Sequence, residues 1–358
     1  MSHAASITIA GRPIGPGHPP YLIAEMSANH GGDLDRALAI VDAFAKAGAD
    51  AIKLQTFTAD TMTLDHDGPG FLIDDGPWAG YRLHDLYRRA HLPWAWHAAL
   101  FARAASHGVA MFSAPFDPTA VAFLAELDAP AYKIASFELV DIPLIQAAAQ
   151  QGRPLIMSTG HADRHDIEAA LGAARDAGAG EIVLLHCVSG YPTPIEDANV
   201  RTIPYLAAQH GVPVGLSDHT LGLAAAAAAV AQGAVAIEKH VTLSRADDTL
   251  DAAFSLEPAE FAALATLCRQ THAALGSPAH TRPASEAASA SHRRSLYVVE
   301  DVPAGTVLTA AHVRSIRPGH GLAPKWLPDI LGRPAARDLR RGEPMAWSML
   351  TDARKALP

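Results

Sequence analysis

The sequence predicts an α/β protein, a (β/α)8 TIM barrel followed by a small β-rich domain. Eight strand-like apolar runs alternate with helical patterns over about 250 residues, which suits a barrel of eight strands and eight helices. Each run begins apolar and ends polar. After the last helical pattern the sequence changes to short strands and Pro/Gly turns. A doubly wound open sheet is the competing architecture, but no Gly-x-Gly-x-x-Gly follows the first strand.

The expected strands account for the barrel one by one. In chain order they cover residues 21–26, 51–57, 109–115, 131–136, 154–160, 181–187, 212–219 and 234–242. Helical patterns lie between them. The pattern over 33–48 begins at a potential N-cap, Asp33, and ends at a potential capping glycine, Gly48, and an Asp and a Gly bound the pattern over 163–178 in the same way.

Composition changes divide the chain into three parts. The last helical pattern ends near residues 275–280, so residues 1–280, with a hairpin at the N-terminus, are expected to form the barrel domain. A polar, Ala/Ser-rich linker is expected over 281–292. Residues 293–358 are expected to form the small β-rich domain with its own minor core.

Charge and cysteine content exclude several classes of protein. The net charge of −9 and the lack of a clustered basic stretch argue against nucleic acid as a partner. No run of 18 apolar residues is free of charges and turn signals, so no membrane span is expected. The N-terminus does not resemble a secretory signal, and two cysteines do not suggest a disulfide framework. We therefore expect a cytoplasmic protein.

Polar residues end all eight expected strands. Because the active sites of such barrels form at the C-terminal ends of the strands, we expect these side chains to meet there. A single polar residue at such a position is about as often a satisfied core group, but eight strands that all end this way favour a site. These residues are Glu25, Lys53, Gln55, Ser113, Lys133, Ser136, Ser158, Thr159, His186, Ser217, Asp218, His219, Glu238, Lys239 and His240.

Two further features suggest ligands. His219 and His240 end adjacent strands, and two imidazoles with oxygen ligands suit a divalent ion, although their spacing alone is a weak signal. Residues 71–96 form an insert that is too long for an ordinary loop and contains three of the five tryptophans. It is either a lid or binding loop, whose aromatic faces suit a sugar, or a subdomain that only packs.

Several motifs are similar to those of one enzyme family. They are YLIAEMSANHGGDLDRALAIVDAFAKAGADAIKLQTF, FSAPFD, YKIASFE, PLIMSTG, HCVSGYPTP, GLSDHTLG and EKHVTL. Through them the chain resembles the sialic acid synthase family. RRSLYVVEDVPAGTVLT and IRPGHGL resemble the antifreeze-like (SAF) domain of that family. KLQTFTADTMTLD, the insert and the C-terminal stretch resemble most the pseudaminic acid synthase branch.

The resemblance implies a transferase that forms a C–C bond. In the family, phosphoenolpyruvate condenses with an open-chain N-acetylated sugar aldehyde, and the reaction consumes water and releases phosphate. In the pseudaminate branch the sugar is 2,4-diacetamido-2,4,6-trideoxy-L-altrose. N-acetylneuraminate or legionaminate synthesis is the alternative. A metal-dependent aldolase or sugar isomerase is a further one, but it would not need two buried lysines and several hydroxyls for an anionic second substrate.

The resemblance also implies roles for individual residues. His219 and His240 would hold a divalent metal, Mn, Co or Mg rather than Zn, which polarises the aldehyde oxygen. Glu238 and Lys239 would form local pairs beside them. The remaining roles are catalysis for Glu25, Lys133, Glu138 and Asp251, phosphoenolpyruvate binding for Lys53, Lys133, Ser136, Ser158, Ser189 and Ser217, and sugar binding for Gln55, Tyr191, Asp251 and Arg317.

Finally, the resemblance implies a homodimer and shows two departures. In the family the SAF domain of one protomer covers the barrel mouth of its partner, and Arg317 matches an arginine that reaches the sugar across the dimer. Without the resemblance, Arg317 would be interpreted as a turn residue. Ala114 stands where the family commonly has Thr, so one donor to phosphoenolpyruvate is absent. Ser189 stands where neuraminate synthases often have Asn.

Overall fold

The computed structural model describes residues 6–277 and 282–351. The chain divides into two compact units, Met1–Gly276 and Ser277–Pro358, and each is described here by itself. The predicted domain boundary at residue 280 and the first predicted linker residue, 281, lie outside the described residues. None of the helices in the described ranges combines the length and the apolar composition that crossing a bilayer requires.

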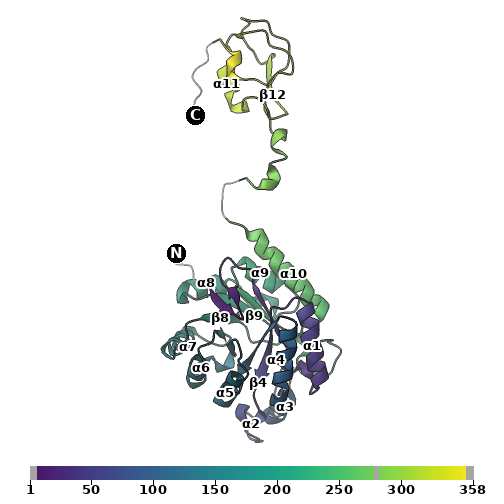
Figure 1. The fold of residues 1–358 in the computed structure, drawn as a ribbon, viewed down its shortest axis with the longest axis vertical. Coiled ribbons are helices and arrows are strands. Elements are labelled where there is room, and N and C mark those ends of the chain that lie inside the picture. The colour runs from purple at the N-terminus through teal and green to yellow at the C-terminus, as the bar shows by residue number, and fades with distance from the viewer. Residues whose placement is uncertain (1–5, 278–281, 352–358) are drawn as a thin grey trace. The chain divides into compact units, whose positions relative to one another are not determined.

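The first unit is the predicted barrel. Its eight parallel strands close on themselves, because β10 pairs with both β9 and β3. Helices surround the strands (Figure 1). The strands are β3 (Tyr21–Glu25), β4 (Ala51–Thr56), β5 (Ala110–Pro115), β6 (Tyr132–Ile134), β7 (Leu155–Ser158), β8 (Ile182–Cys187), β9 (Val214–Asp218) and β10 (Ala236–His240). Each lies within one of the eight expected runs, so the predicted fold class is confirmed.

The helices follow the strands in the expected alternation. They are α1 (Leu34–Lys46), α4 (His97–Ser106), α5 (Pro118–Glu126), α6 (Ile142–Ala149), α7 (Arg164–Asp176), α8 (Thr202–His210), α9 (Ala224–Ala231) and α10 (Pro258–Leu275), and the insert adds α2 (Ala59–Met62) and α3 (Leu83–Ala90). Asp33 caps α1 by accepting hydrogen bonds from the backbone N–H groups of Asp35 and Arg36. Gly48, just beyond this helix, has a φ of 96°, which a glycine adopts without strain.

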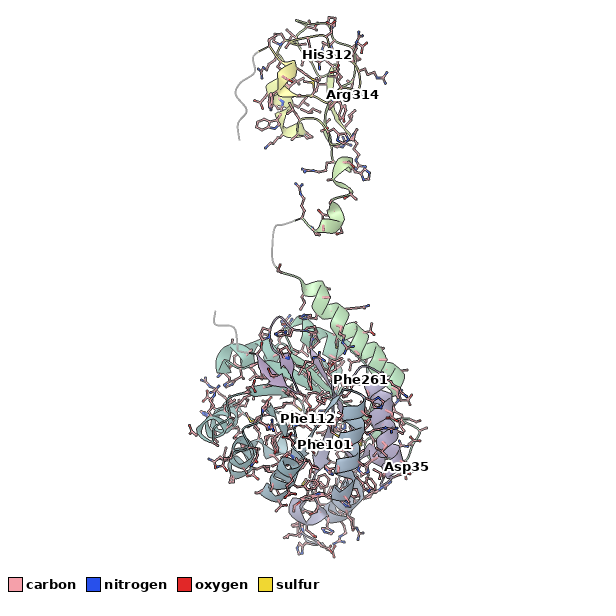
Figure 2. All side chains as sticks on the ribbon, viewed as in Figure 1. Asp35, Phe101, Phe112, Phe261, His312 and Arg314 are labelled. Carbon is pink, nitrogen blue, oxygen red and sulfur yellow. The ribbon has the colours of Figure 1, made fainter. Side chains whose placement is uncertain are left out.

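A hairpin closes the N-terminal end of the barrel. It consists of β1 (Ile7–Ile9) and β2 (Arg12–Ile14), which pair antiparallel. Its three isoleucines pack in one cluster with Tyr21, Ile23 and Phe112. Phe112 is labelled within the barrel in Figure 2. This end of the barrel is therefore filled with apolar side chains, and the charged groups lie at the opposite end of the strands.

The second unit is a small domain with a separate core. Its two longer strands, β11 (Ser295–Val298) and β12 (Val313–Ile316), pair antiparallel, and isolated bridges connect the remaining extended segments. Short helical turns, such as α11 (Leu327–Ile330), complete it. Eleven buried apolar residues, from Leu296 to Leu350, form its core. The predicted β-rich domain is therefore present.

Candidate active site at the carboxyl ends of the barrel strands

The strand register gathers the charged residues in the barrel interior. Glu25 lies opposite Lys53 in the β3–β4 pairing and opposite His240 in the β10–β3 pairing. Glu238 lies opposite Ser217 in the β10–β9 pairing. Because alternate side chains of a barrel strand point inward, these residues share one face and meet at one end of the barrel.

Two carboxylates and two lysines form a buried network. Lys53 Nζ lies 2.8 Å from Glu25 Oε2 and 3.5 Å from Glu238 Oε1. Lys133 Nζ lies 3.9 Å from Glu238 Oε1 and donates a hydrogen bond of 2.7 Å to Ser158 Oγ. All four charged side chains are at most 5% exposed. Burying four charges is costly unless they are paired, and here each is paired.

The same network separates the proton affinities of its members. Burial raises the pKa of Glu25, and Lys53 only partly offsets this effect. For Glu238, burial is outweighed by Lys133 and Lys53, and its pKa lies below the ordinary value. Burial also lowers the pKa of Lys133, whereas Glu238 and Glu25 outweigh burial at Lys53 and raise its pKa. Carboxyls whose pKa values are driven apart suit opposite roles in acid–base chemistry.

Serine hydroxyls lie on one side of the network, where Ser158 contacts Lys133. Ser136 Oγ accepts a hydrogen bond of 3.2 Å from the Gly160 backbone N–H. A Cβ at Gly160 would lie 2.7 Å from Ser136 Oγ and would collide with Ser189 Oγ as well. Both hydroxyls therefore approach the backbone closely, into space that stays open because residue 160 has no Cβ. With Ser158 they form a group of donors next to a lysine, which is an arrangement suited to an anion.

The histidine pair lies on the other side. The rings of His219 and His240 have centroids 5.3 Å apart. His219 Nδ1 lies 3.0 Å from the Val188 carbonyl oxygen, an arrangement that fixes the ring and leaves its other nitrogen available. His240 Nδ1 is buried without a hydrogen-bond partner, and burial lowers the pKa of this imidazole well below its usual range.

These observations fit a divalent ion held by two imidazoles. A neutral imidazole with an unsatisfied buried nitrogen is the form that ligates a metal. Asp251 Oδ2 lies 3.9 Å from His240 Nδ1. Within residues 6–277 and 282–351, no three His, Cys, Asp or Glu residues gather in a metal-binding group. The two histidines would therefore need water or substrate oxygens to complete the coordination.

Tyr191 covers the histidine pair. Its ring centroid lies 4.5 Å from that of His219 and 6.2 Å from that of His240. Phe254 lies 5.4 Å from Tyr191 and 5.1 Å from His240 on the same side. The space next to the two imidazoles is thus bounded by aromatic faces, against which a sugar can stack.

Asp251 and Gln55 border the same region. Gln55 Nε2 donates hydrogen bonds of 2.8 Å to Glu25 Oε1 and 3.0 Å to Ser27 Oγ. Asp251 Oδ2 accepts a long hydrogen bond of 3.5 Å from the Ala28 N–H. Burial raises the pKa of Asp251. Gln55 thus contacts the buried network directly, and Asp251 lies beside His240. Their predicted role as sugar contacts stays a prediction.

A residue that sequence reasoning missed holds the loop of Asp251. Asn29 is fully buried and donates hydrogen bonds of 2.8 Å to the Val241 carbonyl and to Ser255 Oγ. It also accepts one of 2.7 Å from Thr249 Oγ1. Asn29 therefore connects the loop after β3 with the loop after β10. The signal was a polar residue in the first motif, but its partners lie more than 200 residues away.

Four of the strand-end residues face the helices instead of the interior. Lys239 Nζ lies 2.7 Å from Asp218 Oδ2, so this pair lies behind the strands that carry His219 and His240. Ser113 contacts Thr56, which contacts His97 of α4, and His186 contacts the Ala198 carbonyl. The expectation that strand-end polar residues meet in one site is wrong for Ser113 and His186, because odd and even positions of a strand point to opposite faces. The Lys239–Asp218 pair agrees with the local pairing expected for Lys239 and with the alternation that places Ser217 and His219, and Glu238 and His240, on the inner face.

Two further predicted residues and one unexpected residue complete the account of the site residues. Glu138 follows β6, and burial raises the pKa of its carboxyl to about 6. Arg317 is exposed and belongs to the second unit, so its predicted contact with the sugar stays a prediction. Cys187 Sγ lies 3.8 Å from His219 Nδ1 and 3.7 Å from Ser189 Oγ, a position that sequence reasoning did not identify because a lone cysteine at a strand end resembles a core residue.

Comparisons with known proteins agree over almost the whole chain. Residues 40–280 match the NeuB family, and residues 293–351 match the SAF domain. A pseudaminic acid synthase from Campylobacter jejuni is 39% identical over 92% of this chain and 96% of the relative. An N,N'-diacetyllegionaminic acid synthase from Legionella pneumophila is 32% identical over 94% of this chain and 96% of the relative. The crystal structure of an N-acetylneuraminic acid synthetase from Leptospira borgpetersenii aligns with a TM-score of 0.73 at 33% identity, covering 81% of this chain and 96% of that one.

Proposed function

Because the chain belongs to the NeuB family of phosphoenolpyruvate-dependent nonulosonate synthases, we propose that it is a pseudaminic acid synthase. It would condense phosphoenolpyruvate with 2,4-diacetamido-2,4,6-trideoxy-L-altrose and water, giving pseudaminic acid and phosphate. The observation that carries the proposal is the joint burial of Lys53 and Lys133 with serine hydroxyls, next to two imidazoles. Such an arrangement would suit an anion next to an aldehyde.

Phosphoenolpyruvate carries a phosphate and a carboxylate, and it needs cations and hydroxyl donors. Lys53 and Lys133 supply the cations, and Ser136, Ser158 and Ser189 supply hydroxyls on the side of Lys133. Ser217 donates a hydrogen bond of 3.3 Å to Glu238 Oε1 and is a further donor within the same network. Ala114, where a Thr is common, leaves the site with one donor fewer.

The aldehyde end of the sugar belongs at the histidine pair. His219 and His240 would hold a divalent ion, Mn, Co or Mg. When bound, this ion supplies Lewis acidity that polarises the aldehyde oxygen. The ring of Tyr191, 4.5 Å from His219, would cover the same end of the sugar and limit its access to water. Gln55 and Asp251 would hold its hydroxyl and acetamido groups.

The reaction requires two proton movements. A bond forms between C3 of phosphoenolpyruvate and the aldehyde carbon, and the aldehyde oxygen gains a proton. Water adds to C2 of the phosphoenolpyruvate portion and loses a proton, and phosphate leaves. Glu25, whose pKa burial raises, is suited to hold a proton beside Lys53. Glu138, with a pKa of about 6, is the second carboxyl able to exchange one near neutral pH.

Two observations support the pseudaminate product over its alternatives. The identity to a pseudaminic acid synthase is 39%, compared with 32% to a diacetyllegionaminic acid synthase over a similar share of the chain. The aromatic insert also contributes a ring to the site, since Trp78 lies 5.5 Å from Tyr191. A sugar with a terminal methyl group and two acetamido methyls gains from such apolar surface, which favours it over N-acetylmannosamine. The legionaminate precursor carries the same methyl groups, so only the identity argues against that alternative.

We further propose a homodimer in which the SAF domain of one protomer completes the barrel of its partner through Arg317. Mixing an Arg317→Ala variant with a Glu25→Ala variant should restore part of the activity, because one of the two sites in a heterodimer is then intact. No recovery in verified heterodimers would contradict cross-protomer assembly.

A phosphate-release assay tests the reaction. Phosphate should appear only when both phosphoenolpyruvate and an N-acetylated sugar are present, and the product mass should equal that of the sugar plus pyruvic acid. Release of phosphate without a sugar, or sugar conversion without phosphoenolpyruvate, would instead indicate a phosphatase or an isomerase.

A further inference from the structure

One aromatic residue of the insert reaches the candidate site. The ring centroid of Trp78 lies 5.5 Å from that of Tyr191 and 6.4 Å from that of Phe254. Trp78 Nε1 donates a hydrogen bond of 3.2 Å to the Leu250 carbonyl, immediately before Asp251. Trp78 is therefore fixed to the loop that carries one candidate sugar residue, and its ring packs against another.

The other large aromatic residues of the insert have partners elsewhere. Trp94 stacks on Phe123, with centroids 4.7 Å apart, and its Nε1 donates to the Phe57 carbonyl. The Tyr81 hydroxyl accepts from Arg89. Phe71 packs edge-on against His66 at 5.0 Å. Among the ring contacts of the described residues, Trp78 is thus the aromatic residue of the insert that touches Tyr191.

We propose that Trp78 is a specificity-determining residue that contacts the sugar beyond the carbons held at the histidine pair. This inference rests on the proposed function. It assigns to Trp78 the part of the sugar in which the possible substrates differ: the acetamido group at C4 and the methyl at C6 of a 2,4-diacetamido-6-deoxy sugar, against hydroxyls in N-acetylmannosamine.

The order of the rings supports this assignment. Starting from His219, the next ring is Tyr191 at 4.5 Å, and the next is Trp78 at 5.5 Å from Tyr191. A sugar with its aldehyde at the histidines has C1 and C2 beside Tyr191, so its later carbons extend toward Trp78. The indole is partly buried, and its one donor is already used by the Leu250 carbonyl. It therefore offers an apolar face, which suits methyl groups and offers no partner for hydroxyls.

The test compares the two sugars in wild type and in variants of Trp78. Trp78→Ala removes the indole ring and its apolar face, and Trp78→Phe keeps an aromatic ring but loses the hydrogen bond to the Leu250 carbonyl. The matched control is Trp94→Ala, which removes a tryptophan of the same insert that also donates to a backbone carbonyl but stacks outside the site. For each variant, kcat/KM is measured with the 2,4-diacetamido-6-deoxy sugar and with N-acetylmannosamine, and KM is measured for phosphoenolpyruvate.

We expect Trp78→Ala to lower kcat/KM for the diacetamido sugar by about 10- to 200-fold, with a much smaller change for N-acetylmannosamine. The KM for phosphoenolpyruvate should stay at the wild-type value. Trp78→Phe should change the ratio of kcat/KM for the two sugars in the same direction but by less. Trp94→Ala should leave this ratio unchanged.

Three results would overturn the proposal. The ratio could stay at its wild-type value in Trp78→Phe and in any folded Trp78→Ala protein. It could change equally in Trp94→Ala, which would make the effect a general one of the insert. If wild-type enzyme converts neither sugar, the proposed function fails and this inference fails with it, whereas an unchanged ratio in an active enzyme removes only the role of Trp78.

Discussion

Replacing Gly160 with Ala should weaken phosphoenolpyruvate binding while the barrel stays folded. The added Cβ would lie 2.7 Å from Ser136 Oγ and would collide with Ser189 Oγ, closer than real Cβ contacts allow. The backbone of Gly160 does not have a positive φ, so alanine is tolerated by the backbone itself. The atoms that must move are hydroxyl ends of flexible side chains. They can rotate at little cost in stability, but they then leave the position in which they face the substrate.

The size of the effect follows from the lost hydrogen bonds. A hydrogen bond to a charged group contributes about 1.5–3 kcal/mol, so losing one of these hydroxyls should raise the KM for phosphoenolpyruvate by roughly 10- to 150-fold. The assay is phosphate release as a function of phosphoenolpyruvate concentration at saturating sugar, together with the melting temperature.

Gly172→Ala is the matched control, because a Cβ at Gly172 in α7 meets no atom within 4 Å. This variant should keep the wild-type KM and should be at least as stable as wild type, because alanine favours a helix interior over glycine. If Gly160→Ala binds phosphoenolpyruvate as wild type does, Ser136 and Ser189 do not contact this substrate. A large loss of melting temperature in Gly160→Ala would show that the hydroxyls cannot rotate away as argued.

Three further predictions concern the network, the metal and pH. Lys239→Met leaves the Asp218 carboxylate, which is 1% exposed, without its cation. This variant should lower the free energy of unfolding in urea by about 3–5 kcal/mol, and adding Asp218→Asn should restore part of it. A loss below about 1 kcal/mol in Lys239→Met would contradict the pairing. Treatment with a chelator should abolish phosphate release, and Mn, Co or Mg should restore it; full activity of metal-free enzyme would exclude the proposed role of His219 and His240. Burial raises the pKa of Glu138 from 4.5 to about 6, so the ionised carboxyl disfavours the fold progressively above pH 4.5 and fully above about pH 6; Glu138→Gln should therefore stabilise the protein by about 2 kcal/mol at pH 8 and by little at pH 4. If Glu138 transfers a proton, kcat/KM of wild type should fall below about pH 6 and this fall should be absent in the same variant; an identical pH profile in both proteins would argue against proton transfer by Glu138.

The fold could be predicted from the sequence because its signal is local and repeated. Each strand is an apolar run, and each helix carries its own start and stop residues, such as Asp33 and Gly48. The direction of individual side chains was less predictable. Lys239 and His240 are neighbours in one strand end, yet one pairs with Asp218 behind the sheet and the other faces the interior. A shift of one residue in the strand reverses such an assignment.

Contacts between distant segments were not predictable from the sequence. The position of Trp78 depends on where an insert folds back onto the loop before Asp251, about 170 residues later. The roles of Asn29 and Gly160 appear only when their neighbours are known. The side chain of Asn29 makes hydrogen bonds to three distant groups. Gly160 leaves room for the Ser136 and Ser189 hydroxyls, which a Cβ would displace. The sequence carries the residue types, but their partners are a property of the closed barrel.

The most direct test of the proposed function is the specificity of the enzyme for its sugar. At saturating phosphoenolpyruvate, kcat/KM should be measured by phosphate release for 2,4-diacetamido-2,4,6-trideoxy-L-altrose, the legionaminate precursor and N-acetylmannosamine in separate reactions. Burying two methyl groups in place of solvated hydroxyls predicts that the altrose derivative is preferred over N-acetylmannosamine by about 10- to 200-fold. Equal values, or a preference for either of the other two sugars, would contradict the assignment as a pseudaminic acid synthase.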